Sequence, residues 1–298
     1  MVESDRTNAD FKAGSTRINE WRRFGRVFFR RRIVIFGLFI LLMLGFTAVF
    51  ANWIAPYNPY KQNLREILQQ PSKKHLLGTD SVGRDTLSRV IYGSRTTVTV
   101  GFVSAGIAAS IGITLGMIAG YFGGIINMII MRFTDVLMPF PMIVLALLLA
   151  AVLGGGIQNV ILALGIAMVP GYIRVMCGMT LSIRENDYIL AERAMGASHL
   201  RIMLRHVLPN AFAPIIVVIT LQLGFLILSE AALSFLGIGI RPPGAAWGAM
   251  VNEGYRFLVR IPILSFAPGA AIMLVVFAFN MVGDALRDAL DPRLRGLI

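Results

Sequence analysis

Six long apolar segments, separated by polar ones, dominate the pattern of the chain. Each holds roughly the 20 residues that an α-helix needs to cross the hydrocarbon core of a bilayer. Continuous apolar runs favour helices because lipid offers the backbone no hydrogen-bond partner, whereas a β-barrel would show short alternating segments. The pattern therefore predicts an all-α membrane protein with six spanning helices, at residues 33–54, 97–121, 126–152, 157–178, 211–237 and 264–285.

The polar segments between these runs predict an orientation. An even number of spans places both termini on one side of the membrane, and nine Lys and Arg residues precede residue 33. A basic tail beside an apolar run marks the cytoplasmic side. This orientation assigns sixteen basic residues to inside segments and ten to outside segments. We expect cytoplasmic segments at 1–32, 179–209 and 286–298, and external loops at 55–96 and 238–263.

Composition narrows the class of protein further. Hydrophobic residues make up 56% of the 298 residues and charged residues only 15%, whereas soluble domains hold about 25% charged residues. The mean hydropathy of +0.71 excludes a soluble globule and a disordered chain. Much of the net charge of +12 comes from the tail, which argues against nucleic acid as a partner. The single cysteine, Cys177, excludes a disulfide framework and a zinc cluster of cysteines.

The second apolar run carries small residues at every fourth position, Ala108, Gly112, Gly116 and Gly120. This spacing stacks them on one helix face, where another backbone can approach closely. The partner helix belongs either to this chain or to a second membrane subunit.

A few charged and polar residues interrupt the apolar runs. Arg132 and Asp135 share a helix face and can pair, and Arg174 is close enough to the inner boundary to snorkel to the cytoplasm. Glu230 lies near the outer boundary, where it either faces a wet path or caps neighbouring helix ends. Gln222 shares roughly its face. The residues expected along a translocation path are Glu230, Gln222, Asp135 and Arg174.

The sequence lacks the motifs of several common catalytic chemistries. No lysine completes a Walker phosphate-binding pattern, neither H-E-x-x-H nor G-x-S-x-G occurs, and the three histidines form no metal-ligand spacing. We therefore expect no catalytic residue, metal site or cofactor in this chain. No acidic pair or unwound motif recurs in both halves, which argues against a secondary transporter.

The polar stretch 185–210 predicts two short helices. Asp187 is the expected N-cap of a helix that runs to Met195, and Gly196 is expected to end it in the left-handed conformation. Ser198 is the expected cap of a second helix that ends before Pro209. Together they would form a compact knob (residues 187–208), although an amphipathic interfacial loop could have the same pattern.

The knob resembles the signature E-A-A-x3-G-x9-I-x-L-P of ABC importer permeases. Aligned on Gly196, the spacing places Leu208 and Pro209 at its final two positions, whereas Leu190, Glu192 and His206 depart from it. Four other stretches resemble the dipeptide, oligopeptide and nickel permeases, specifically their second, C-type subunit. They include the segments 75–93, Arg132-x-x-Asp135 with Phe140-Pro141, 230–248 and 283–293. The resemblance covers about residues 20–298.

This resemblance implies a type I ABC importer permease in a prokaryotic inner membrane. It implies pairing with a homologous permease, two ATPase subunits that bind ATP and Mg²⁺, and an extracytoplasmic substrate-binding protein. The expected cargo is di- or oligopeptides, with nickel or another small solute as the alternative, and a non-transport scaffold as the rival from another class. The knob would dock on an ATPase subunit through Glu192, Arg193, Ala194, Met195, Gly196, Ala197, Leu208 and Pro209.

Overall fold

A computed structural model describes residues 24–29 and 31–290 of the chain. Most of the predicted tail and residues 291–298 lie outside this range. The described residues form helices and contain no strand, apart from one isolated bridge between Thr79 and Asp85. The helices are α2 (Arg32–Ile54), η1 (Leu64–Glu66), α3 (Thr86–Phe122), α4 (Gly124–Leu137), α5 (Met142–Leu153), α6 (Ile157–Arg184), α7 (Asp187–Ala194), α8 (His199–Ile202), η2 (Met203–Val207), α9 (Leu208–Phe235), α10 (Trp247–Tyr255) and α11 (Ile263–Leu290).

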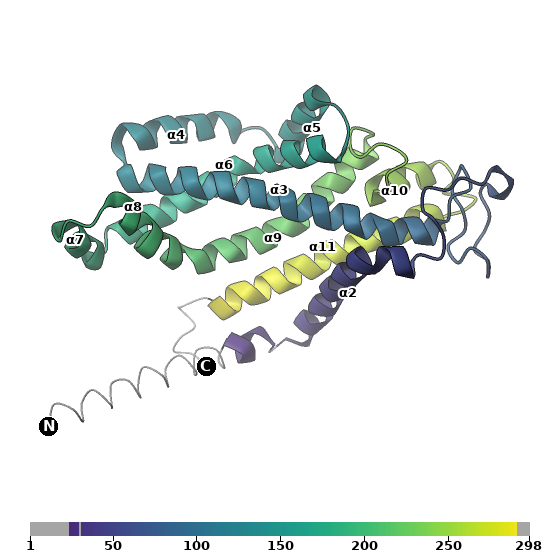
Figure 1. Ribbon diagram of the computed structural model, residues 1–298, viewed down its shortest axis with the longest axis horizontal. Coiled ribbons are helices and arrows are strands. Elements are labelled where there is room, and N and C mark those ends of the chain that lie inside the picture. The colour runs from purple at the N-terminus through teal and green to yellow at the C-terminus, as the bar shows by residue number, and fades with distance from the viewer. Residues whose placement is uncertain (1–23, 30, 291–298) are drawn as a thin grey trace.

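Long apolar helices build the bundle (Figure 1). Five of the helices in the described part are long and apolar enough to cross a membrane, or six when the pair α4 and α5 counts as one span. The sequence predicts an uninterrupted helix over 126–152, but α4 and α5 meet at an angle of 87°. The break falls at Pro139 and Pro141, since proline lacks the N–H that a continuous helix requires and restricts the residue before it.

The helix α3 begins eleven residues before its predicted apolar run. Asp85 precedes the helix, and its carboxylate accepts a hydrogen bond from the Ser88 N–H. With this N-cap, α3 begins among polar residues that precede its apolar run. The whole helix is 37 residues long. The expected external loop 238–263 likewise contains a helix, α10.

The glycine face of α3 packs against α6 of the same chain. A methyl group at Gly116 would lie 2.5 Å from the Ile173 carbonyl oxygen, and one at Gly112 would lie 2.3 Å from the Tyr172 Cβ. The two backbones are therefore in close contact, and of the two partners expected for this face the structure selects a helix within the chain.

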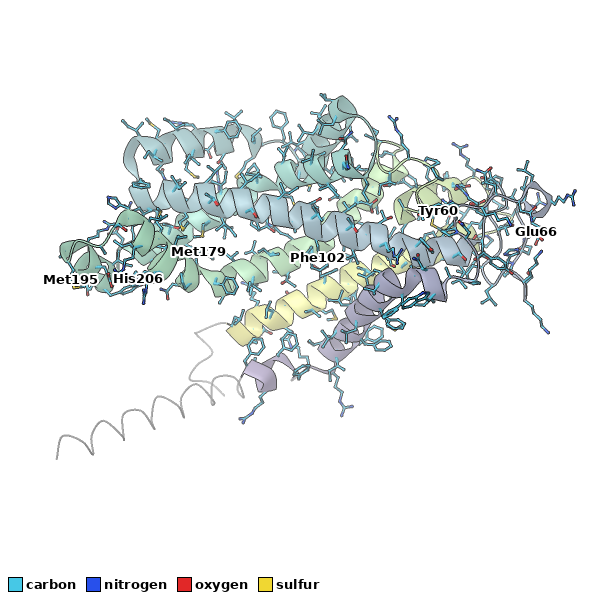
Figure 2. The ribbon with its side chains drawn as sticks, viewed as in Figure 1. Tyr60, Glu66, Phe102, Met179, Met195 and His206 are labelled. Atoms are coloured by element: carbon cyan, nitrogen blue, oxygen red, sulfur yellow. The ribbon has the colours of Figure 1, made fainter. Side chains whose placement is uncertain are left out.

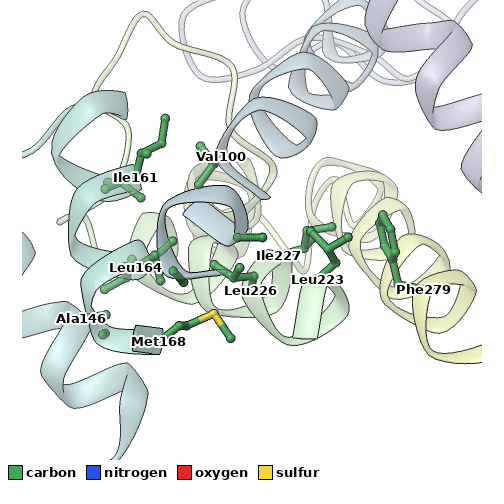
Figure 3. Packing of buried hydrophobic residues seen from close by; sticks show 14 of the residues in the cluster. Val100, Ala146, Ile161, Leu164, Met168, Leu223, Leu226, Ile227 and Phe279 are labelled. Atoms are coloured by element: carbon green, nitrogen blue, oxygen red, sulfur yellow. The ribbon is translucent and has the colours of Figure 1, made fainter. Parts of the chain in front are cut away.

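The main hydrophobic core lies where α3, α6, α9 and α11 meet. Val100 of α3, Leu164 of α6 and Leu223 and Ile227 of α9 are buried together, with Phe279 of α11 at one side (Figure 3). This core packs α3 against α6, α9 and α11. The packing fixes the positions of the two ends of α3 relative to each other. The start of α2 and the end of α11 also meet, through Arg31 and Asp288 at 3.4 Å.

Candidate functional site

The knob lies at one end of the bundle, beyond the C-terminal ends of α3 and α6 (Figure 1). Gly196 joins α7 to α8 with φ of +82°, which confirms the predicted left-handed stop. The Ser198 hydroxyl accepts a hydrogen bond from the Arg201 N–H at 3.4 Å, which confirms the predicted cap. Asn186 occupies the N-cap position of α7, and Asp187 lies one residue inside the helix. There its negative charge interacts favourably with the positive end of the helix dipole.

The second helix does not end before Pro209, in contrast to the prediction. After α8 the chain makes a π-helical turn, η2, and continues directly into α9. The Leu208 N–H bonds to the Met203 carbonyl, five residues back. This shift in hydrogen-bond register occurs just before Pro209, which then occupies the first turn of α9, where its missing N–H is tolerated.

The tip of the knob exposes apolar side chains. Met195 is 75% exposed, and Leu190, Leu200 and Leu204 are also exposed. Figure 2 shows Met195 at the extreme end of the molecule. Of the other residues predicted to dock, Arg193, Ala194, Gly196 and Pro209 are exposed, and Glu192, Ala197 and Leu208 are half-buried.

Contacts to the end of α3 hold the knob in place. The Tyr121 hydroxyl lies 2.9 Å from His199 Nδ1, and the Arg193 guanidinium lies 4.9 Å from the centroid of the Tyr121 ring. Arg184, at the end of α6, donates to the Gly120 carbonyl at 2.9 Å, and within the knob Glu192 lies 3.4 Å from His206 Nε2. Sequence reasoning missed Tyr121, because nothing local distinguishes it from other aromatic residues at the end of an apolar run.

The charged residues predicted along a path come together in one pair. Asp135 of α4 forms an ion pair with Arg174 of α6, and both side chains are half exposed. The predicted partner of Asp135 was Arg132, and Arg174 was expected to snorkel. The bend after α4 and the packing of α4 on α6 bring two residues 39 positions apart into contact, which helical spacing alone cannot reveal.

Gln222 and Glu230 lie on α9. Gln222 is half-buried and faces Gly171 of α6, less than one turn from Arg174. Glu230 lies about 12 Å further along α9 and is buried. It accepts a hydrogen bond from Ser234 at 2.7 Å, and the Ser234 hydroxyl accepts one from the Ile240 N–H at 3.3 Å. The carboxylate thus braces the turn that follows α9.

A polar cap, formed by residues 55–85 and α10, covers the other end of the bundle. Arg84 pairs with Asp80 at 2.6 Å and with Glu253 of α10 at 3.1 Å. Arg89 lies 3.5 Å from Asp80, and these arginines and the aspartate are buried. Sequence reasoning missed this network, although opposite charges four residues apart, in Asp80/Arg84 and Asp85/Arg89, are a signal for it.

A second set of contacts in the cap surrounds His75. Its Nδ1 lies 2.8 Å from Asp85 and its Nε2 lies 3.4 Å from Glu66. Glu66 also pairs with Lys74. Hydrogen bonds from Lys74 and then His75 hold the pKa of the Glu66 carboxyl below its ordinary value of 4.5.

The described residues thus combine a bundle of helices long and apolar enough to span a membrane with a half-exposed ion pair, a polar cap and a short helical knob. Residues 112–296 match the family described as the binding-protein-dependent transport system inner membrane component. Residues 19–71 match the N-terminal transmembrane domain of oligopeptide transport permease C.

Curated relatives align along almost the whole chain. The dipeptide transport system permease protein DppC of Alkalihalophilus pseudofirmus is 41% identical over 94% of this chain and 92% of its own length. The glutathione transport system permease proteins GsiD of Pectobacterium atrosepticum and Escherichia coli O6:K15:H31 are 41% and 42% identical, over 92% and 93% of this chain and 92% and 91% of their own. An inward-facing structure of the MetNI methionine ABC transporter has the same fold, with a TM-score of 0.55 and 20% identity, over 68% of this chain and 96% of that one.

The chain therefore belongs to the inner-membrane component family of binding-protein-dependent transport systems. It is a multi-pass permease subunit of an ABC importer in a bacterial inner membrane, with the type I permease fold. The family implies that an ATPase and a substrate-binding protein act with it in general.

Proposed function

We propose that this chain forms one half of the path through which small peptides, glutathione included, enter the cell. A homologous permease forms the other half, and two ATPase subunits bind ATP and Mg²⁺ and hydrolyse the ATP. The names of relatives that are 41–42% identical over nearly the full chain support this cargo, because both a dipeptide and glutathione present peptide bonds and free carboxylates.

The proposed orientation places the knob in the cytoplasm and the cap outside. The basic residues of the predicted tail support it, since positively charged segments stay on the cytoplasmic side. The contact of Arg31 with Asp288 is consistent with both termini on one side. The cap then faces the substrate-binding protein.

The proposal that the knob docks on an ATPase subunit rests on its apolar tip. Exposed apolar side chains on a segment outside the lipid mark a protein contact, and Met195, Leu190, Leu200 and Leu204 of the knob are all exposed. The small residues Ala194 and Gly196 permit a close approach of the partner. We assign the predicted docking set, from Glu192 to Ala197 with Leu208 and Pro209, to one ATPase subunit.

The proposed translocation path follows α4, α6 and α9. Asp135 and Arg174 are half exposed in the isolated chain, so they are available to a path completed by the second permease. Gln222 continues this polar line along α9. Glu230 is buried beyond it, and we assign it to the outer end, where it braces the turn after α9.

The test is uptake by the complete complex, reconstituted in proteoliposomes with its binding protein. We expect ATP-dependent uptake of labelled dipeptides or glutathione, and none when ATP is replaced by a non-hydrolysable analogue. Uptake of Ni²⁺ without uptake of any peptide would contradict the cargo but leave the permease assignment intact. A scaffold without transport activity would take up neither.

A further inference from the structure

The knob connects to the rest of the bundle by backbone at two places, and neither of them is α3. It continues into α9 through η2, and a short break at residues 185–186 connects α7 to α6. The helix α3 ends at Phe122, where Gly123 and Gly124 follow, both with positive φ. Movement of the knob therefore reaches α3 directly only through non-covalent contacts.

Tyr121 makes the polar part of these contacts. Its buried ring lies beneath the Arg193 guanidinium of α7, at a distance typical of a cation–π interaction. Its hydroxyl lies 2.9 Å from Nδ1 of His199, the first residue of α8. One side chain of α3 thus touches both short helices of the knob.

The other end of α3 is fixed to the cap by specific polar contacts. The Trp247 indole N–H donates to the Val90 carbonyl at 2.9 Å. Glu253 lies 3.1 Å from Arg84, just before α3, and 4.0 Å from Arg89 within it. Trp247 and Glu253 both belong to α10, so α3 and α10 are held together by hydrogen bonds and ion pairs.

Between these two ends α3 has no proline and is 37 residues long, which corresponds to about 55 Å. Its glycine face is in close contact with α6, so the helix is supported against bending. A continuous supported helix passes a displacement from one end to the other, whereas a flexible loop would absorb it.

We propose that Tyr121 is a positioning residue that couples the knob to α3, so that movement imposed on the knob reaches α10 and the face where the binding protein docks. This inference rests on the proposed function, because the knob must first dock on an ATPase subunit. Conversely, docking of the binding protein on the cap would stimulate ATP hydrolysis through the same helix.

The test compares Tyr121→Phe with the wild-type complex in proteoliposomes. Phenylalanine keeps the ring and its contact with Arg193 and removes only the hydroxyl that contacts His199. We expect normal assembly, thermal stability and basal ATPase activity. Stimulation of the ATPase by the binding protein loaded with labelled dipeptide should fall about fivefold, which is the effect of losing one hydrogen bond of about 1 kcal/mol.

Two further variants separate coupling from a structural role. His199→Ala removes the hydrogen-bond partner together with the ring contact between His199 and Phe122, and should lower the stimulation at least as much. The double variant should be no worse than His199→Ala alone, since the contact that Tyr121→Phe removes is already absent in that variant. Tyr92→Phe is the matched control, because Tyr92 also lies on α3 and its hydroxyl bonds Asn52 at 2.7 Å, at the cap end. It should keep wild-type stimulation.

The outcomes distinguish the two levels of the proposal. A wild-type complex that takes up neither dipeptide nor glutathione overturns the proposed function. A functional wild type with undiminished stimulation in Tyr121→Phe and His199→Ala overturns the role of Tyr121 alone. Additive losses in the double variant, or an equal loss in Tyr92→Phe, also overturn it, because neither fits a single contact between the knob and α3.

Discussion

The cap holds a buried network of paired charges around Arg84, whereas the charged side chains of the knob lie at or near its surface. Figure 2 places Glu66 and Tyr60 at one end of the molecule and Met195 and His206 at the other. In the cap, Asp80 and Arg84 are nearly inaccessible to solvent and form an ion pair. A buried charge network holds its shape only when each charge finds a partner, so the geometry of the cap is set within the chain.

The knob differs because its contacts are incomplete. Its buried side is anchored to α3 and α6, but Met195, Leu200 and Leu204 face outwards. An apolar surface of this kind gains free energy when a partner covers it. The two ends therefore differ in where their charges lie, and we propose that the exposed apolar side chains of the knob are covered by another subunit.

The largest effect is expected from breaking the cap network. Arg84→Ala would leave Asp80 buried with its main ionic partner removed, which costs about 3–5 kcal/mol. We expect a strongly lowered Tm in detergent, or failure to accumulate in the membrane. Lys74→Ala is the matched control, since Lys74 is exposed and solvent screens its ion pair, so its loss should change Tm only slightly. Similar Tm values for the two variants would contradict a self-supporting cap.

At the knob, an exposed charge should impair function without affecting stability. Met195→Asp removes the most exposed apolar side chain of the tip and places a solvated carboxylate where the ATPase subunit would bind. We expect co-purification of the ATPase and peptide uptake to fall at least about tenfold, an effect of about 1.4 kcal/mol or more, with an unchanged Tm. As the control, Leu64→Asp alters an exposed leucine of the cap and should retain the ATPase subunit. Equal retention in both variants would argue against docking at the knob.

A backbone variant of the knob sharpens the comparison with a smaller effect. Gly196 has positive φ, and a side chain there would meet no neighbouring atom within 4 Å. Gly196→Val therefore acts through backbone strain of about 1–2 kcal/mol, whereas Gly196→Asn is expected to tolerate the same conformation. We expect coupled uptake to fall several-fold for valine. If asparagine is equally impaired while Tm is normal, the partner's close approach, and not the backbone, explains the requirement for glycine.

The smallest effect concerns the surface of the cap and depends on pH. Because the pKa of Glu66 in the folded protein is below 4.5, chiefly through Lys74, its ion pair stabilises the fold at neutral pH. That contribution is lost as the pH falls through the lowered pKa. Lys74→Ala should therefore reduce Tm slightly at neutral pH, and the gap from wild type should close in acid. A gap that widens in acid would contradict the pairing.

How far the sequence predicts the structure depends on the range of the interactions. The apolar runs predict α2, α6 and α11 well because burial in lipid is a local requirement of composition. Gly196 and Ser198 are likewise predictable, because backbone conformation and capping depend on immediate neighbours. These features give the class of protein and the shape of the knob.

Contacts between distant segments could not be derived in this way. Asp135 pairs with Arg174 because a bend in the chain brings α4 onto α6, although Arg132 is nearer in sequence. The effect of proline was also hard to predict. Proline interrupts the helix at Pro141, but a π-helical turn before Pro209 lets the helix continue. The attachment of Tyr121 to the knob similarly depends on where α3 ends in space.

The most direct test of the account is site-specific labelling at the two ends. The only cysteine, Cys177, is buried, so Met195→Cys and Leu64→Cys each introduce one accessible thiol. With a membrane-impermeant maleimide, we expect Met195→Cys to react only in inside-out vesicles and to be protected by bound ATPase subunits. Leu64→Cys should react only in right-side-out vesicles, and the ATPase should not change its labelling. Labelling of both thiols from the same side, or of Met195→Cys equally with and without the ATPase, would contradict the account.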